Sequence, residues 1–235
     1  MPRVRNEERF GQLLDAGIRV FIASGGFRRT QVSDVARECG MAKGTVYLYV
    51  ASKEALFDQC LRFAAGAELS SERPVPTPEP GATLRFLQDT LRDQGRGLRL
   101  YADDGVVDKG GSQAEEGLQD IVLEMYDLLC RFRALIKLVG TSAGDWPELA
   151  TVWYGEGRAG LQASIEDYLR RGIARARFRE VTDVSVGARM LMELVHWFAV
   201  QRWFDAQPQA MQEEHVKAVL CEAAVRTFVR EQQER

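Results

Sequence analysis

The residues best suited to chemistry lie between Thr30 and Phe57, in the run TQVSDVARECGMAKGTVYLYVASKEALF. Its second half combines small residues, a hydroxyl, two tyrosines and a lysine at helical spacing. Small residues allow a helix to approach a groove of duplex DNA closely, and the polar ones can reach phosphates or base edges. The run therefore predicts a surface that contacts the major groove.

Two short helices must position these side chains. Val32, Val35 and Ala36 form the inner face of the first, and Gly40 breaks the chain after it, as a left-handed position following a helix requires. A second helix over 42–48 would then expose its polar side. This pattern is typical of a helix-turn-helix whose second helix reads DNA.

The rest of the chain also has helical periodicity. An amphipathic helix is expected over 6–24, Thr30 and Ser52 are the expected N-terminal caps of two later helices, and four prolines predict an extended connector over 74–80. Further helical patterns lie near 83–100, 117–142, 154–176, 185–204 and 210–231. No alternation typical of strands occurs, so the fold class is all-α. We expect a three-helix DNA-binding domain over 1–60 and a helical ligand-binding and dimerisation domain over 61–235.

Composition gives weaker information. The net charge is −3, and residues 1–60 carry nine Lys or Arg against seven Asp or Glu, so charge alone does not indicate a DNA-binding protein. The four cysteines are far apart in apolar surroundings, which favours reduced core thiols and no metal site. No apolar run is long enough for a membrane span and no signal segment is visible, so we expect a cytoplasmic protein without cofactor or membrane partner.

The first 60 residues resemble the tetracycline-repressor (TetR) family. The resemblance rests on Gly26-Phe27, Val32-Ser33-Asp34-Val35-Ala36, Gly40-Met41-Ala42-Lys43-Gly44-Thr45-Val46-Tyr47, Tyr49 and Ser52-Lys53-Glu54-Ala55-Leu56-Phe57. It implies base contacts from Ser33, Lys43, Thr45 and Leu48, and phosphate contacts from Gln31, Tyr47, Tyr49 and Lys53. Val50 stands where the family usually has an aromatic residue, which affects only buried packing.

The remainder resembles the family's ligand-binding and dimerisation region more loosely, through Trp146-Pro147-Glu148-Leu149 and the run from Tyr168 to Arg175. One short recognition helix makes too few contacts for a specific site, so we expect a homodimer on a palindromic operator in double-stranded DNA. The expected interface comes from the last two helices: Leu191, Leu194, Val195, Phe198, Trp203, Val216, Leu220 and Ala223.

The expected effector is a largely apolar small molecule. Aromatic and flexible apolar side chains are abundant between 83–100, 117–142 and 154–176, and such side chains line most small-molecule pockets. The expected pocket residues are Phe86, Leu91, Met125, Tyr126, Leu129, Trp153 and Tyr154. These side chains can equally serve as ordinary core.

Other functions remain open at this point. The chain can be a repressor that its effector releases, an activator, an interaction module that has lost DNA binding, or an all-helical enzyme. The last is disfavoured because no metal cluster, nucleophile motif or phosphate loop is present. The string from Gly155 to Gly160 spells G-x-G-x-x-G, but it lies in a helical pattern with no preceding strand, unlike a dinucleotide site.

Overall fold

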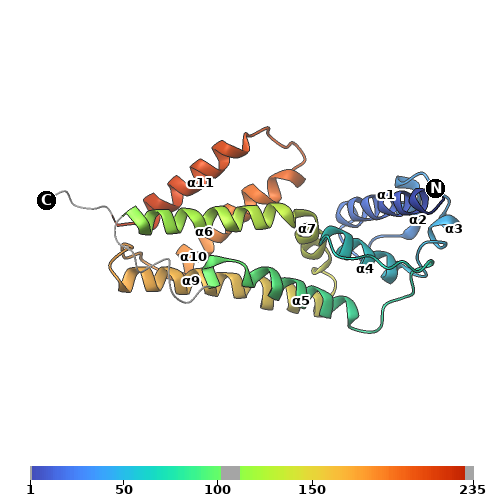
Figure 1. Cartoon of the computed structure of the whole chain (residues 1–235), viewed down its shortest axis with the longest axis horizontal. Coiled ribbons are helices and arrows are strands. Elements are labelled where there is room, and N and C mark those ends of the chain that lie inside the picture. The colour runs from blue at the N-terminus through green and yellow to red at the C-terminus, as the bar shows by residue number, and fades with distance from the viewer. Residues whose placement is uncertain (1, 102–111, 231–235) are drawn as a thin grey trace. The chain divides into compact units, whose positions relative to one another are not determined.

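The computed structural model describes residues 2–101 and 112–230, and in this part of the chain every regular element is a helix. The predicted all-α class is therefore confirmed (Figure 1). Contacts group the chain into two compact units. Unit 1 consists of Met1–Thr90 and Ala134–Tyr154, and unit 2 of Leu91–Arg133 and Gly155–Arg235.

Unit 1 is built on α1 (Pro2–Ala23), which packs against α2 (Val32–Glu38) and α4 (Lys53–Ala64). Its core contains the apolar side chains of Phe10, Leu13, Leu14, Phe21, Val35, Val46, Leu56, Phe57 and Leu61. Two further helices lie wholly in this unit, α3 (Lys43–Val46) and α8 (Pro147–Ala150). Three other elements lie in it only in part, because the unit boundaries cross them: α5 (Ala82–Arg96), α7 (Arg133–Ser142) and a π-helical stretch (Thr151–Arg158).

Two expected helix caps have different outcomes. The Ser52 hydroxyl accepts a hydrogen bond from the Ala55 amide at 3.1 Å, so the predicted cap of α4 is confirmed. The prediction for Thr30 is wrong, because Gln31 precedes α2 and makes no side-chain cap. The buried Thr30 hydroxyl instead donates to the Gly26 carbonyl at 2.9 Å and closes the turn before α2.

Unit 2 is a helical bundle in which α6 (Ser112–Arg131) contacts α10 (Val184–Ala199) and α11 (Glu213–Phe228), while α9 (Ala159–Ala174) packs on α10 (Figure 1). Short 3-10 turns are present at Arg99–Tyr101 and Gln201–Phe204. Two expected helices are shorter than predicted. The pattern over 117–142 is interrupted at Phe132, and the pattern over 185–204 leaves the α-helix after Ala199.

A buried polar cluster ties three elements of unit 2 together. The Arg202 side chain is only 6% exposed and donates to the Phe198 carbonyl at 2.6 Å and to the Tyr126 hydroxyl at 3.1 Å. Arg202 also pairs with Glu213, which accepts a hydrogen bond from the same Tyr126 hydroxyl. Because a buried charge is tolerated when it is paired and hydrogen-bonded, this cluster fixes α6 against α11 and the turn between α10 and α11.

The cysteines are consistent with the expectation of reduced thiols. All four are free, Cys60 and Cys221 are buried, and Cys39 and Cys130 are half-buried. Burial raises the pKa of the Cys60 thiol, which keeps it protonated at neutral pH. Within the described ranges, no three His, Cys, Asp or Glu residues gather as metal ligands, and no helix has the length and apolar character needed to cross a membrane.

Tyr168 on α9 gives a stability prediction. Its ring is buried and packs edge-on against Phe178, with ring centroids 5.4 Å apart, but its hydroxyl has no hydrogen-bond partner among the described residues. An unpaired buried polar group costs about 1–3 kcal/mol, so Tyr168→Phe should raise the free energy of unfolding by roughly 1 kcal/mol. Tyr126→Phe is the matched control. Its hydroxyl is hydrogen-bonded, so that variant should be less stable in the same denaturant titration; equal changes in both would contradict the assignment.

Candidate nucleic-acid interface

Core packing and a backbone turn in unit 1 stabilise the helix-turn-helix. Gly40 adopts φ +65° between α2 and α3, and the Met41 amide donates to the Ala36 carbonyl at 2.8 Å. Val46 of α3 is fully buried, as is Val35 of α2. The two helices therefore share one small core, and the opposite side of α3 points away from it.

The recognition helix is shorter than the expected 42–48. Its α-helical part is Lys43–Val46, and the chain then tightens into a turn in which the Leu48 amide donates to Thr45 and the Tyr49 amide to Val46. Tightening of this kind is common at the end of a helix. We call the accessible residues within 43–48 the recognition face: Lys43, Gly44, Thr45, Tyr47 and Leu48.

Large apolar side chains are exposed on the recognition face. Leu48 is 68% exposed and Tyr47 is 40% exposed, with Lys43 exposed beside them and Thr45 half-buried. Leu48 and Tyr47 are adjacent in the sequence and both exposed, so this face offers apolar surface suited to a contact such as a thymine methyl group. Gln31 is exposed at the start of α2, where its side-chain oxygen accepts a hydrogen bond from the Ser33 hydroxyl at 3.4 Å.

Two predicted phosphate-contacting residues have partners inside unit 1. Tyr49 is only 8% exposed and its ring stacks on Phe10, with centroids 5.9 Å apart. The Lys53 ammonium group donates to the carbonyls of Phe27 (3.0 Å) and Thr30 (3.2 Å) and lies 4.4 Å from the centre of the Phe27 ring. Both residues therefore hold the helix-turn-helix together, and their contact with phosphate stays a prediction.

The Gly26-Phe27 turn is stabilised by side chains that the sequence did not indicate. The Phe27 amide donates to the buried Ser142 hydroxyl at 3.2 Å, and the Phe27 ring packs on those of Phe57 and Trp146. Trp146 and Phe57 are themselves in contact, with centroids 5.9 Å apart. Ser142 lies more than a hundred residues along the chain from the turn, so no local pattern could have indicated this packing.

The predicted effector residues divide between the two units. Phe86, Trp153 and Tyr154 belong to unit 1, where Phe86 packs under the Arg62 guanidinium. The other four belong to unit 2: Leu91, Met125, Tyr126 and Leu129. Met125 and Tyr126 are buried, and the Tyr126 hydroxyl is already bonded to protein groups. The pocket itself remains a prediction.

The predicted interface residues need a correction. Four of the eight are buried in the core of the single chain and have no surface for a partner: Leu191, Val195, Val216 and Leu220. Their periodicity reflects the inner faces of α10 and α11. Leu194 and Trp203 are exposed, while Phe198 and Ala223 are half-buried.

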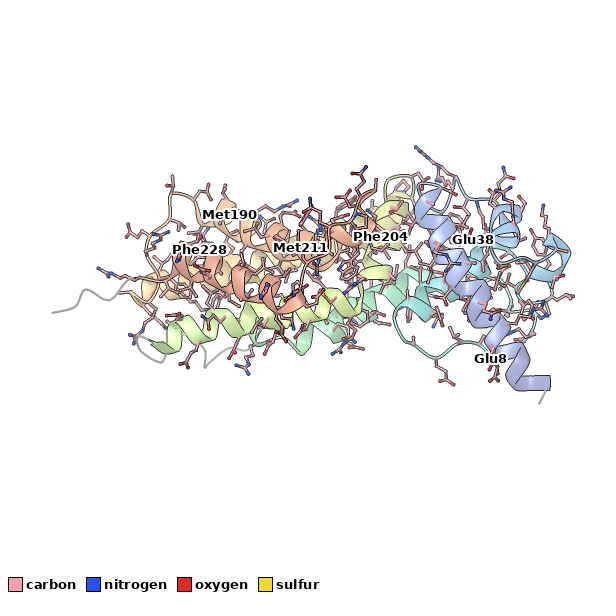
Figure 2. All side chains as sticks on the ribbon, turned by 90° about the horizontal axis from the view of Figure 1, so that it is seen from above. Glu8, Glu38, Met190, Phe204, Met211 and Phe228 are labelled. Carbon is pink, nitrogen blue, oxygen red and sulfur yellow. The ribbon has the colours of Figure 1, made fainter. Side chains whose placement is uncertain are left out.

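The outer face of α10 carries an apolar stripe, and α11 has one large exposed apolar residue. On α10, the exposed apolar residues recur at intervals of three or four: Val186, Met190, Leu194 and Trp197 (Figure 2 labels Met190). On α11, Val219 is 58% exposed. These exposed residues, rather than the buried ones, are the interface candidates.

Models of known protein families match both parts of the chain. The model described as "Bacterial regulatory proteins, tetR family" matches residues 13–60. The model described as "AefR-like transcriptional repressor, C-terminal domain" matches residues 116–231.

The G-x-G-x-x-G string lies at the end of the π-helical stretch and the start of α9, with no strand before it in the described chain, as expected.

Two curated relatives match over short segments. The chain is 44% identical to the fatty acid metabolism regulator protein of Bacillus subtilis over 46 residues, which are 20% of this chain and 23% of the relative. It is 32% identical to the uncharacterized HTH-type transcriptional regulator YerO of the same organism over 68 residues, 29% of this chain and 23% of the relative. The chain thus matches about a quarter of each relative's length.

Solved structures show the same fold over nearly the whole chain. The ketosteroid transcriptional regulator KstR2 of Mycobacterium tuberculosis covers 95% of this chain and 96% of its own, with 20% identity and a TM-score of 0.56. A TetR-like transcriptional regulator from Rhodococcus sp. RHA1 covers 93% and 94%, with 19% identity and a TM-score of 0.51. Because family models match residues 13–60 and 116–231, the chain belongs to the TetR family of transcriptional regulators.

Proposed function

We propose that this regulator binds duplex DNA as a homodimer, with the recognition face of each subunit in the major groove of one half of a palindromic operator. The observation that carries the proposal is the exposure of Tyr47 and Leu48 on a short helix whose other side is anchored in the core. A rigid, exposed surface next to a buried anchor is what reading base edges requires.

We assign the role of repressor rather than activator. The match of residues 116–231 to the C-terminal domain of AefR-like transcriptional repressors supports this choice. A transcription assay with purified polymerase and the bound promoter distinguishes the two, because a repressor lowers transcript yield and an activator raises it.

Release by a small, largely apolar effector completes the proposal. A ligand that binds one state of the dimer more tightly shifts the dimer toward that state, and the shift is limited by its differential affinity. Coupling of about 1–3 kcal/mol would change DNA affinity about 5–150-fold, and DNA must weaken effector binding by the same factor. One relative is named a fatty acid metabolism regulator, so a fatty acid is the first probe to titrate with and without DNA.

The direct test of DNA binding starts from a pool of randomised duplexes. The full-length protein should enrich a palindromic sequence, because a two-fold dimer reads two equivalent half-sites. Its affinity for the selected duplex should exceed that for a scrambled duplex by about a thousandfold or more at physiological salt. If selection enriches nothing, the proposal is refuted.

Substitutions at two exposed residues of the recognition face should have different effects, one on selectivity for the operator sequence and the other on affinity for any duplex. Leu48→Ala removes an apolar contact with a thymine methyl group in each half-site, so preference for the selected duplex should fall roughly tenfold. Tyr47→Phe removes a hydroxyl that contacts phosphate, so it should weaken binding to both duplexes alike. Fluorescence anisotropy on the selected and scrambled duplexes measures both effects. Equal losses of preference in the two variants would contradict the assignment.

A further inference from the structure

The segment over residues 70–80, which we call the strap, pairs with residues 49–51, which directly follow the recognition face. The Val75 amide donates to the Tyr49 carbonyl, and the Ala51 amide donates to the Val75 carbonyl, both at 2.8 Å. These bonds form a parallel bridge between Val50 and Val75, whose side chains are both buried. The expected extended connector is therefore bound along the helix-turn-helix.

Side-chain contacts fix the strap at further points on α4. The Ser70 amide donates to the buried Gln59 side-chain oxygen at 3.2 Å, and the Thr77 hydroxyl donates to that of Ser52 at 2.8 Å. Just beyond the strap, the Thr83 hydroxyl donates to the buried Asp58 carboxylate at 2.8 Å. Gln59 and Asp58 are polar residues in a core, and these bonds explain why their burial is tolerated.

A stack of three side chains joins the strap to α1 and to Tyr49, the residue that follows the recognition face. The Arg73 guanidinium lies 3.7 Å from the centre of the Phe10 ring. Phe10 in turn stacks on Tyr49 with an interplanar angle of 11°. Arg73 is held in place because it also donates to the Ser70 carbonyl at 2.5 Å. Residues 49–51 are thus bound by α1 on one side and by the strap through their backbone.

A four-residue helix such as α3 cannot maintain its own position, because isolated helices of this length are unstable. Its start is fixed by the turn at Gly40 and its buried side by Val46. Its end passes directly into residues 49–51, which pair with the strap. The orientation of Tyr47 and Leu48 therefore depends on this pairing.

We propose that the strap is a positioning element for DNA reading, with Val75 and Arg73 as its positioning residues. This inference rests on the proposed function. Base contacts need side chains placed within a fraction of an ångström, whereas phosphate contacts tolerate small shifts. Release of the strap should therefore reduce selectivity for the preferred sequence more than it reduces binding to arbitrary DNA.

The test compares Val75→Pro with Val75→Ala in the full-length protein. Proline removes the amide that donates to the Tyr49 carbonyl, while alanine keeps both backbone bonds and loses only buried methyl groups. The selected and scrambled duplexes serve as probes. For Val75→Pro we expect the ratio of the two affinities to fall about tenfold, and for Val75→Ala we expect the ratio to stay within about twofold of wild type.

Hydrogen exchange gives a readout that does not depend on DNA. The Ala51 amide should exchange slowly in the wild type and in Val75→Ala, and at least about tenfold faster in Val75→Pro. The proposal is overturned if Val75→Pro keeps the wild-type affinity ratio. It is also overturned if the affinity ratio falls in both variants in proportion to the decrease in their melting temperatures. Wild-type protein that shows no sequence preference would instead refute the proposed function.

Discussion

Gly26→Ala should destabilise unit 1 by about 3 kcal/mol or more and lower the melting temperature by roughly 6–12 °C. Gly26 has φ +114°, a conformation that side chains rarely adopt. A Cβ there would also lie 2.9 Å from the Ser142 Cα and from the Thr141 carbonyl oxygen, which are backbone atoms that cannot move independently. Differential scanning calorimetry measures the change.

Gly40→Ala is the matched control for this prediction. Gly40 also has a positive φ, +65°, but a Cβ there meets no atom of the described residues within 4 Å apart from its two chain neighbours. This variant should therefore cost only about 1 kcal/mol, the penalty of the left-handed conformation alone. The packing of the Gly26 turn against α7 would be disproved by equal losses of stability in the two variants.

Val219→Glu should convert the dimer into a monomer and weaken binding to the selected duplex about a hundredfold or more. Val219 is highly exposed in the single chain, so the change should leave the fold of the subunit intact. In a dimer it would bury an unpaired charge, which is strongly unfavourable. A monomer then binds one half-site and loses the advantage of simultaneous binding to both.

Sedimentation velocity at micromolar concentration measures the oligomeric state, and Ala163→Glu provides the control. Ala163 is an exposed small residue on α9 and is not one of the exposed apolar residues of α10 and α11, so that variant should stay dimeric. A dimeric Val219→Glu protein with unchanged DNA affinity would show that the interface lies elsewhere.

The structure of the helix-turn-helix could be predicted best, because it depends on the spacing of neighbouring residues. The turn at Gly40, the buried Val46 and the exposed Leu48 all follow from helical periodicity and a single glycine, and the structure has each of them. Family resemblance supplied the role of this surface, which periodicity alone could not. The C-terminal helices were also predictable as helices, but their boundaries differ where Phe132 and Ala199 end regular α-structure.

Periodicity could not distinguish a core face from an interface face. Leu191 and Val195 were expected at a subunit interface, yet they are buried within one chain, while Val186 and Trp197 on the other side of α10 are exposed. Both faces of this helix are apolar, so only the packing of neighbouring helices determines which face is covered.

Long-range contacts account for the other differences. Lys53 and Tyr49 have residue types that suit phosphate, but the carbonyls and ring that engage them come from Phe27, Thr30 and Phe10. The bridge between Val50 and Val75 likewise joins residues that no helical pattern connects. These contacts depend on the folded backbone and cannot be derived from spacing.

Hydroxyl-radical footprinting of the full-length protein on the selected duplex tests the central claim most directly. Two recognition faces related by a two-fold axis should protect two half-sites whose centres lie about 34–36 Å apart, or a multiple of that distance. Leu48→Ala should weaken protection at both half-sites equally, since each subunit contributes the same residue. A single protected segment, or protection independent of sequence, would contradict the account of a dimer that reads DNA through residues 43–48.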